Sequence, residues 1–460
     1  MKRKEQQSAL RRRKKAKTDS DEQNDEDRIS KLPDELRSYI LSKLPTADAM
    51  KTSLLSTRWK HTWTSVTNLE FDFGQFPKFK GRNSAFTKFV NQAIITHDGL
   101  DIQRFHLQLY AYRSKLPYAR FWISFAVRHF VQELELCIPK IALDKLPDLL
   151  FTCESLRLLK LDLSGNVLKL PTSVTLINLQ TLHLESMSFR DDNVVWELIS
   201  SCPKLENLTL NNCSMYGMKI LNICSSELQN LSLLNCQTFS SCEVNISAPK
   251  LKTFRYHCSL VRKLSLEHVC TLTKADIDLH GSLYFVKRDK ELSNRAIRIL
   301  KELDNVRTLT LSARCTEYLS TAIDLLGSFS CNLRTVKHLD VAFWSHKSYI
   351  KVLSSLLKCC PTVETLSVGI DMQTFTGYSD VPLKNVKTTI PKCLLHKLKT
   401  VKLRNLVGVN KLDLVKFLVK NAEVLEKIIT VSKEGVVKER TVEWIKSRAQ
   451  SLVNSNRKTT

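Results

Sequence analysis

The chain has 460 residues, of which 43% are hydrophobic and 25% charged, a composition typical of globular proteins but a length too great for one compact core. No run approaches 18 consecutive apolar residues and the N-terminus has no apolar leader, so we expect neither a membrane span nor a secretion signal. Fourteen Cys without a Cys-x-x-Cys pair favour a reduced intracellular setting, and the net charge of +24 favours acidic or phosphorylated partners.

Residues 1–27 form a charged tail. The first 17 residues hold nine Lys or Arg and one acid, and six acids follow by position 27. So polar a segment is predicted to be disordered. Its basic groups resemble a bipartite nuclear import signal, so we expect the chain in the nucleus, the cytoplasm or both. The residues concerned are Lys2, Arg3, Lys4, Arg11, Arg12, Arg13, Lys14 and Lys15.

Residues 28–66 predict three short helices. Pro33 fits the first helical position, Pro45 ends that helix, and Thr46 can cap the next. Ser56 can cap a third helix that carries Trp59 and Trp63. A segment this short cannot bury all its Leu, Pro and Trp side chains within itself, so it predicts either a docking face or a subdomain packed against the rest of the chain.

The order of residues in this segment resembles the F-box. Leu32-Pro33-Asp34-Glu35-Leu36 is followed by Ile40-Leu41-x-x-Leu44-Pro45 and by Ser56-x-Arg58-Trp59. The resemblance implies binding to an SKP/ASK-type adaptor and, through it, to the cullin of a ubiquitin ligase. The implied adaptor-binding residues, which the sequence does not separate from an internal core, are Leu32, Pro33, Leu36, Ile40, Leu41, Leu44, Pro45 and Trp59.

Residues 100–385 repeat one pattern, an apolar residue followed by two variable positions, an apolar, a variable and an apolar position. It recurs twelve times from Ile102 to Leu403, with starts 21 to 35 residues apart, which is the period of leucine-rich repeats. The fold class predicted is therefore α/β, an F-box followed by a right-handed solenoid with a curved parallel sheet.

The variable positions within each predicted strand should face the concave side, where solenoids usually bind partners. Candidate substrate-binding residues there are His183, Glu185, Thr209 and Asn211. Cys213 and Cys236 occupy the inward Asn/Cys position after the strand, which favours a structural role. We also predict return helices over 192–201 and 347–359, and loops at 281–300, 316–332 and 371–395, where the repeat spacing is wide.

Residues 391–430 predict a strand, a loop, an amphipathic helix ending near Asn421, and a second strand. This segment resembles the FBD domain found at the C-terminus of plant F-box proteins with leucine-rich repeats, and we expect it to cap the solenoid. Residues 431–460 form a polar, basic tail with a predicted helix around 442–452.

No sequence motif predicts an active site. The chain has no Gly-x-Gly loop, no Gly-Lys-Ser/Thr and no His-Glu-x-x-His, so neither a cofactor nor a metal is predicted. The prediction is a non-catalytic substrate-recognition subunit of an SCF-type ubiquitin ligase, with a protein substrate and with nucleic acid and membrane not expected as partners. Three alternatives stay open: a basic nucleic-acid or chromatin scaffold, a small-molecule receptor, and an interaction module without ligase assembly.

Overall fold

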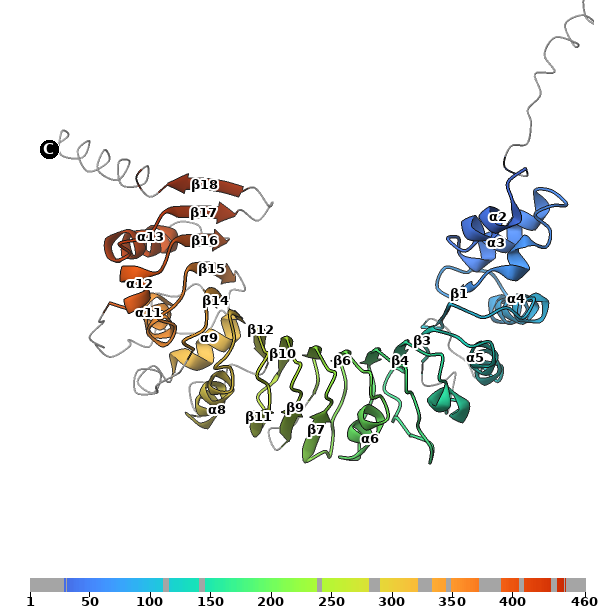
Figure 1. Cartoon of the computed structure of the whole chain (residues 1–460), viewed down its shortest axis with the longest axis horizontal. Coiled ribbons are helices and arrows are strands. Elements are labelled where there is room, and N and C mark those ends of the chain that lie inside the picture. Colours follow the sequence, from blue (N-terminus) through green and yellow to red (C-terminus); the bar gives the residue numbers. More distant parts are fainter. Residues whose placement is uncertain are drawn as a thin grey trace, which may run out of the picture.

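The structure, a computed structural model, is an open arc with the F-box segment at one end (Figure 1). A long curved sheet lines the inner side of the arc, and helices cover most of its outer side (Figure 1). The residues that the structure describes are 29, 31–110, 116–139, 145–237, 242–280, 290–321, 333–344, 349–371, 390–404, 409–431, 437–441 and 443.

The F-box segment contains two α-helices, α2 (Asp34–Leu41) and α3 (Thr46–Lys51), and two short 3₁₀-helices, η1 (Thr52–Leu54) and η2 (Thr62–Ser65). Pro33 and Pro45 stand immediately before the two α-helices, so α2 begins one residue later than predicted. The predicted third helix is wrong, because residues 55–61 form turns. Thr and Ser are frequent there, and their hydroxyls bond to nearby carbonyls, as Thr62 does to Arg58 at 2.9 Å, which competes with helix formation.

Thr46 was predicted to cap a helix through its hydroxyl, and this too is wrong. Thr46 is buried, and its Oγ1 accepts a hydrogen bond from the backbone N–H of Glu70 at 2.7 Å. The hydroxyl therefore joins the F-box to the first strand of the sheet. A second bond, from Asn68 Nδ2 to the carbonyl of Ser42 at 3.1 Å, makes the same connection.

The main sheet has 15 strands in the described part of the chain. Neighbouring strands are parallel except for the last pair, and all twelve predicted repeats are strands. In spatial order they are β1 (Asn68–Asp72), β2 (Arg104–Gln108), β3 (Glu133–Cys137), β4 (Leu158–Asp162), β5 (Thr181–Glu185), β6 (Asn207–Asn211), β8 (Asn230–Leu234), β10 (Thr253–Ser259), β12 (Lys274–His280), β13 (Thr308–Leu311), β14 (His338–Trp344), β15 (Thr365–Asp371), β16 (Thr400–Arg404), β17 (Lys427–Val431) and β18 (Val437–Thr441).

The repeat pattern determines both the register and the core. Leu182 of β5 pairs with Leu208 of β6, which pairs with Leu231 of β8, so equivalent apolar positions form a row across the sheet. Successive side chains of a strand point to opposite faces, so these Leu lie inside while the residues between them face the concavity. Each repeat contributes only a slice of core, and stacking makes that core continuous.

The outer layer contains both helices and a second, smaller sheet. The helices are α4 (Arg82–Thr96), α5 (Ala119–Arg128), η3 (Asp148–Thr152), α6 (Val194–Ser200), α8 (Lys290–Lys301), α9 (Ala313–Ser320), α11 (Tyr349–Cys359), α12 (Lys392–His396) and α13 (Val409–Asn421). A second parallel sheet, which we did not predict, lies between the helices and contains β7 (Ile220–Cys224), β9 (Glu243–Ser247) and β11 (Lys263–Glu267).

Both predicted return helices are confirmed as α6 and α11. The predicted loops are wrong where α8 occupies 290–300, α9 extends to residue 320, and α12 begins at residue 392. In α8 the buried side chains Ala296, Ile297 and Leu300 recur at helical spacing, a signal that the wide gap in the repeat obscured. The remaining parts of those loops lie outside the described residues.

The C-terminal strand, helix and second strand are confirmed as β16, α13 and β17. They extend the same sheet by two parallel strands, and the antiparallel β18, missed in the sequence, closes it. The assignment of 391–430 as an FBD cap stays a prediction. The predicted helix over 442–452 lies outside the described residues apart from Glu443.

Candidate protein-interaction surfaces

The F-box has a small core of its own. Leu41, Trp59 and Trp63 are buried in it. Arg37, whose side chain is only 4% exposed, forms an ion pair with Asp34 and donates a hydrogen bond to the carbonyl of Arg58. Its guanidinium also lies 5.7 Å from the centre of the Trp59 ring. Arg37 therefore holds α2 against the turn that follows α3, a role that the sequence did not suggest.

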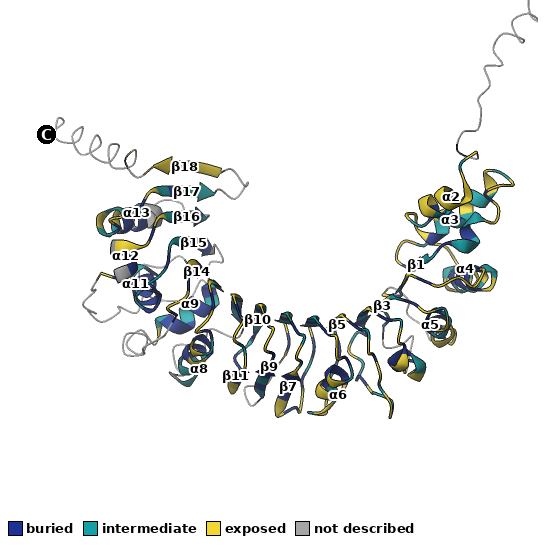
Figure 2. Cartoon of the chain, viewed as in Figure 1, coloured by how far each residue is buried: buried dark blue, intermediate teal, exposed yellow. Residues whose placement is uncertain are grey.

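The same segment has many exposed residues, and several of them are large and apolar (Figure 2). Leu36 is 50% exposed and Leu54 is 86% exposed, values unusual for Leu. The exposed large apolar side chains between Asp34 and Leu55, here called the F-box apolar face, are Leu36, Tyr39, Ile40, Leu44, Leu54 and Leu55. Exposed large apolar side chains gathered on one short segment are typical of protein-binding sites.

The structure separates the eight predicted adaptor-binding residues into two groups. Leu41 and Trp59 lie in the core, so they can only position the face. Leu32 is half-buried, and Pro33, Leu36, Ile40, Leu44 and Pro45 are exposed. Sequence reasoning missed Tyr39, Leu54 and Leu55. Helical spacing from Leu36 reaches Tyr39, but nothing in the sequence predicted that Leu54 and Leu55 point outward.

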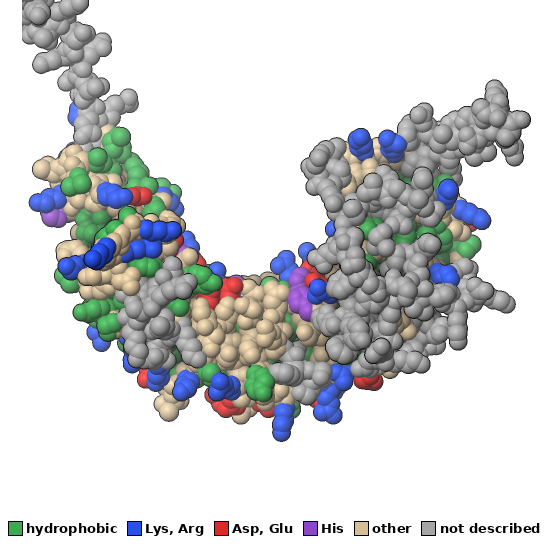
Figure 3. All heavy atoms as spheres, turned by 180° about the vertical axis from the view of Figure 1, so that it is seen from behind, with side chains coloured by type: hydrophobic (Ala, Val, Ile, Leu, Met, Phe, Trp, Pro, Cys, Tyr) green, Lys and Arg blue, Asp and Glu red, His purple; other side chains and the backbone are tan. Residues whose placement is uncertain are grey.

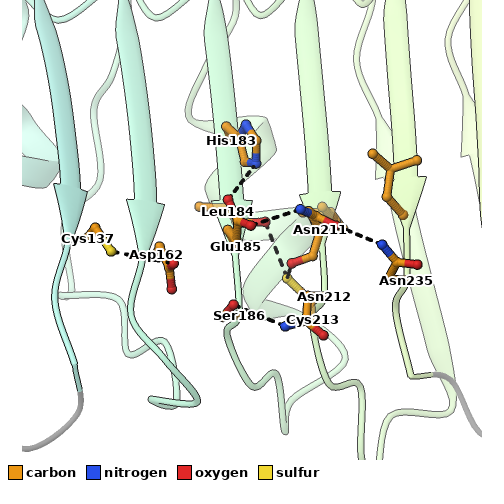
Figure 4. Close-up of polar contacts among 12 residues, drawn as sticks. Cys137, Asp162, His183, Leu184, Glu185, Ser186, Asn211, Asn212, Cys213 and Asn235 are labelled. Atoms are coloured by element: carbon orange, nitrogen blue, oxygen red, sulfur yellow. Dashed lines mark hydrogen bonds and ion pairs between the residues drawn. The ribbon is translucent and has the colours of Figure 1, made fainter. Parts of the chain in front are cut away.

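The concave face is the second candidate surface, and it contains all four predicted substrate-binding residues. His183 and Glu185 lie on β5, and Thr209 and Asn211 are their register partners on β6. Asn211 Nδ2 donates to Glu185 Oε1 at 2.9 Å, and His183 Nε2 lies 3.4 Å from Glu185 Oε2 (Figure 4). Asn235, which follows β8, donates to Asn211 Oδ1 at 3.4 Å and extends this polar chain.

Charge on the concave face changes along the arc. The outward positions of β1 to β5 carry six acids and two basic residues, Arg104 and Lys160. The outward positions of β6 and β8 carry no charge. We call the six acids the acidic strip: Glu70, Asp72, Glu133, Glu135, Asp162 and Glu185.

Beyond the uncharged strands, acidic, basic and His side chains alternate. Asp276, Asp278 and Asp340 lie among the outward residues of β12 and β14, and Arg255 and Arg404 among those of β10 and β16. Figure 3 shows red side chains on the inner rim near the F-box end, and purple and blue ones farther along. The two halves of the concavity therefore differ in charge.

The pKa values of two His side chains on this face are shifted in opposite directions. Burial lowers the pKa of His183, so its imidazole is neutral at pH 7. A hydrogen bond with Asp276, whose Oδ2 lies 3.1 Å from Nε2, raises the pKa of His257. The neutral His183 thus adds no positive charge to the acidic strip, whereas His257 carries positive charge more readily.

The two inward cysteines are structural, as predicted. Cys213 Sγ lies 3.4 Å from the carbonyl of Leu184, and Cys236 Sγ lies 3.4 Å from that of Leu210, one repeat along. A hydrogen bond with Cys236 and burial together raise the pKa of Cys213, so the thiol stays protonated and unreactive. On the concave face, burial and the neighbouring Asp162 raise the pKa of Cys137 to about 12 (Figure 4).

Within the described ranges, no group of three or more His, Cys, Asp and Glu side chains is arranged to hold a metal ion. Within the same ranges, every helix is too short or too polar to cross a membrane. The predicted nuclear import residues all lie outside the part of the chain that the structure describes.

Comparison with known proteins gives two family matches. A family described as "At1g61320/AtMIF1, LRR domain" matches residues 94–457, and the F-box domain matches residues 29–71. The second match extends beyond the predicted boundary at residue 66 into β1, the strand that hydrogen-bonds to Thr46.

Several Arabidopsis thaliana proteins are similar over almost their whole length. F-box/FBD/LRR-repeat protein At1g78750 is 29% identical over 444 residues, which cover 90% of this chain and 92% of that protein. F-box/FBD/LRR-repeat protein At1g51370 is 28% identical over 412 residues, covering 88% of this chain and 89% of that protein. F-box/LRR-repeat protein 13 is 29% identical over 433 residues, covering 90% and 92%.

Proposed function

The chain belongs to the plant F-box/LRR family with an LRR domain of the At1g61320/AtMIF1 type, and on that premise we propose that it is the substrate-recognition subunit of an SCF-type ubiquitin ligase. The F-box apolar face binds the SKP/ASK-type adaptor and, through it, the cullin. The concave face binds the protein to be ubiquitinated. The chain itself holds the substrate near the transfer machinery and performs no chemistry.

The observation that carries this proposal is the F-box apolar face. Six large apolar side chains stay exposed on a segment that already has a packed core. Burying each aliphatic side chain in a partner contributes about 1.5 to 3 kcal/mol, so a few of them suffice for stable assembly. A segment that only terminated the solenoid would gain nothing from exposing them.

Ubiquitin transfer in this scheme belongs to other subunits. The contribution of this chain is proximity, since tethering the substrate replaces a bimolecular encounter by an effectively intramolecular one. That role requires two separate surfaces on one rigid body. The parallel sheet, which begins at β1 beside the F-box and runs without interruption through the concave face, supplies the rigidity.

Two further parts of the proposal concern the ends of the chain. The basic block Arg11–Lys15 directs the protein into the nucleus, and the segment 391–430 acts as an FBD cap on the solenoid. Replacing Arg11, Arg12, Arg13, Lys14 and Lys15 by Gln in a fluorescent fusion should shift the protein towards the cytoplasm. An unchanged distribution would contradict the nuclear import signal.

The adaptor test is co-purification of the full chain with a plant SKP-type adaptor and cullin. The test variant is Leu36→Ser/Ile40→Ser, which changes two exposed residues of the F-box apolar face. The matched control is Ile95→Ser/Phe121→Ser, two exposed apolar residues on α4 and α5. Salt of about 300 mM screens surface charge, so the binding that survives is mainly apolar.

We expect the wild type and the control to retain the adaptor and the F-box variant to lose it. Thermal melting of all three proteins separates lost binding from lost folding. If the wild type does not bind any adaptor, or if the F-box variant binds as well as the control, the ligase proposal is wrong.

A further inference from the structure

We infer that the substrate contributes an extended Lys- and Arg-rich segment, which binds along the acidic strip with its F-box end in a groove beside β1. This inference rests on the proposed function and names the chemistry of the substrate. It is the opposite of what the chain's overall charge suggests, since a net charge of +24 favours an acidic partner. The local surface, rather than the average charge, decides which partner a concave face takes.

The carboxylates of the acidic strip are mostly unneutralised. Within the described residues, Glu135 is the one member whose carboxylate forms an ion pair with Lys or Arg, with 2.7 Å between Oε1 and Arg104 Nη2. Glu185 and Asp162 accept hydrogen bonds from neutral donors, the Asn211 amide and the Ser164 backbone N–H. Such carboxylates have no Lys or Arg paired with them in the described part of the chain, and a partner that supplies guanidinium or ammonium groups satisfies them.

The strip has the dimensions of a peptide site. Its acids come from β1, β3, β4 and β5, and β2 between them contributes no acid but carries Arg104. These five neighbouring parallel strands are about 4.8 Å apart. The strip is therefore about 19 Å long, which an extended segment of about six residues spans at about 3.3 Å per residue. The uncharged amide side chains of β6 and β8 mark its far end, where Asn207 and Asn230 bond to each other.

A groove at the edge of β1 continues the strip towards the F-box. It has a volume of about 540 Å³. Its apolar lining includes Met50, Phe76 and Phe89, and also Leu54, which the groove shares with the F-box apolar face. The outward carboxylates of Glu70 and Asp72 stand among them. Because these two acids belong both to the groove and to the strip, the two features form one surface.

This combination specifies the partner more closely than charge alone. Lys and Arg bury their aliphatic stems along apolar surface while their charged heads reach a carboxylate. The groove therefore suits an apolar or aromatic residue of the partner that is followed by basic residues over β3 to β5. Phosphopeptides and nucleic acid are disfavoured at this face, since the six carboxylates repel phosphate.

The test measures peptide affinity of the full chain in complex with the adaptor, by fluorescence anisotropy. The probes are three synthetic peptides of about twelve residues, long enough to cover the strip and the groove. One is rich in Lys and Arg with a single Phe near one end, one has Gln at the basic positions, and one has Glu there. We expect tight binding of the basic peptide, weak binding of the Gln peptide and no binding of the Glu peptide.

Two variants with the same change in net charge locate the site. Glu70→Gln/Glu133→Gln/Glu185→Gln neutralises half of the acidic strip, and Glu154→Gln/Glu197→Gln/Glu423→Gln neutralises three exposed acids elsewhere. We expect the first to weaken binding of the basic peptide about tenfold, which is about 1.4 kcal/mol, and the second to leave it unchanged. Equal effects of the two variants, or a preference for the Glu peptide, would overturn the inference.

The chain's own basic tail is the competing occupant. If the wild type ignores the basic peptide and the variant with Gln at Arg11–Lys15 binds it, the tail fills the strip and the inferred substrate segment is wrong. Adaptor retention is scored in the same samples. Loss of peptide binding with adaptor retained affects only this inference, whereas loss of adaptor binding by the wild type affects the proposed function.

Discussion

The F-box and the repeat sheet differ in where their apolar side chains go. In the sheet, rows such as Leu182, Leu208 and Leu231 are fully enclosed, and the outward positions between them are polar. In the F-box, Leu41 and Trp59 are enclosed while Leu36, Ile40 and Leu54 remain outside. The sheet is thus complete by itself and offers a polar binding face, whereas the F-box has an apolar surface that only a partner can cover.

The largest expected effect of a substitution is on the stability of the repeat sheet. Phe254 on β10 is fully buried between β8 and β12, and Phe254→Ala should cost about 3 to 5 kcal/mol of unfolding free energy. The loss should spread along the stacked repeats, because each one relies on its neighbours for its core. Urea unfolding gives the size of the effect, and hydrogen exchange its extent.

Phe254→Leu is the milder control and should cost much less, because it keeps most of the buried volume. Protection of the F-box amides should change little in either variant. An equal loss of protection in the F-box would contradict the separation of the two regions.

The next largest expected effect is a loss of stability in the F-box alone. Arg37→Met removes the ion pair with Asp34 and the hydrogen bond to the Arg58 carbonyl, which should cost about 1 to 3 kcal/mol locally. Hydrogen exchange should show a loosened α2 and unchanged repeats, and adaptor binding should weaken through lost positioning. Lys60→Met, an exposed basic residue of the same segment, is the control and should do neither. Full stability of the Arg37 variant would contradict the role given to this side chain.

The smallest expected effect is on how the stability of the two halves of the concave face depends on pH. The pKa of His257 is raised, so its contribution to stability is fully present below pH 6.5 and is lost as the pH rises through the raised pKa. The pKa of His183 is lowered, so protonation of the unfolded chain removes stability as the pH falls below 6.5. Each effect should be below about 1 kcal/mol, since both side chains are partly exposed.

Melting temperatures of His257→Gln and His183→Gln between about pH 5.5 and 8 measure both effects. Relative to the wild type, His257→Gln should lose stability mainly at low pH, and His183→Gln should gain stability there. Parallel pH curves for the two variants would contradict the opposite environments of the two residues.

Much of the sheet could be predicted because the repeat is a strong periodic signal. A strand in a stacked parallel sheet needs apolar residues at alternate positions, and the twelve matches of the pattern are all strands. The β7, β9 and β11 sheet carries a similar alternation, Leu221 with Ile223, Val244 with Ile246, and Leu264 with Leu266, which lay between the stronger matches. Likewise, Leu69 and Phe71 of β1 fit the pattern but lie between the predicted F-box, which ended at residue 66, and the predicted repeats, which began at residue 100.

The F-box was less predictable for a physical reason. Leu36, Ile40 and Leu41 are chemically alike, and helical spacing groups all three on one side, yet Leu41 is buried and the other two are exposed. Which side of a short helix faces its own core depends on tertiary contacts such as the position of Arg37 over Trp59. On the concave face, by contrast, alternation alone predicts the outward positions of β5 and β6, which are those of His183, Glu185, Thr209 and Asn211. Their part in substrate binding stays a prediction.

The central claim is that one rigid chain carries two binding surfaces that can be disrupted separately, although Leu54 belongs to both. It is tested most directly by measuring adaptor retention and basic-peptide affinity in parallel for the wild type, for Leu36→Ser/Ile40→Ser and for Glu70→Gln/Glu133→Gln/Glu185→Gln. The account predicts that the first variant loses the adaptor and keeps the peptide, and that the second keeps the adaptor and binds the peptide about tenfold more weakly. The claim is wrong if either folded variant loses both adaptor binding and peptide binding, or if both variants keep both.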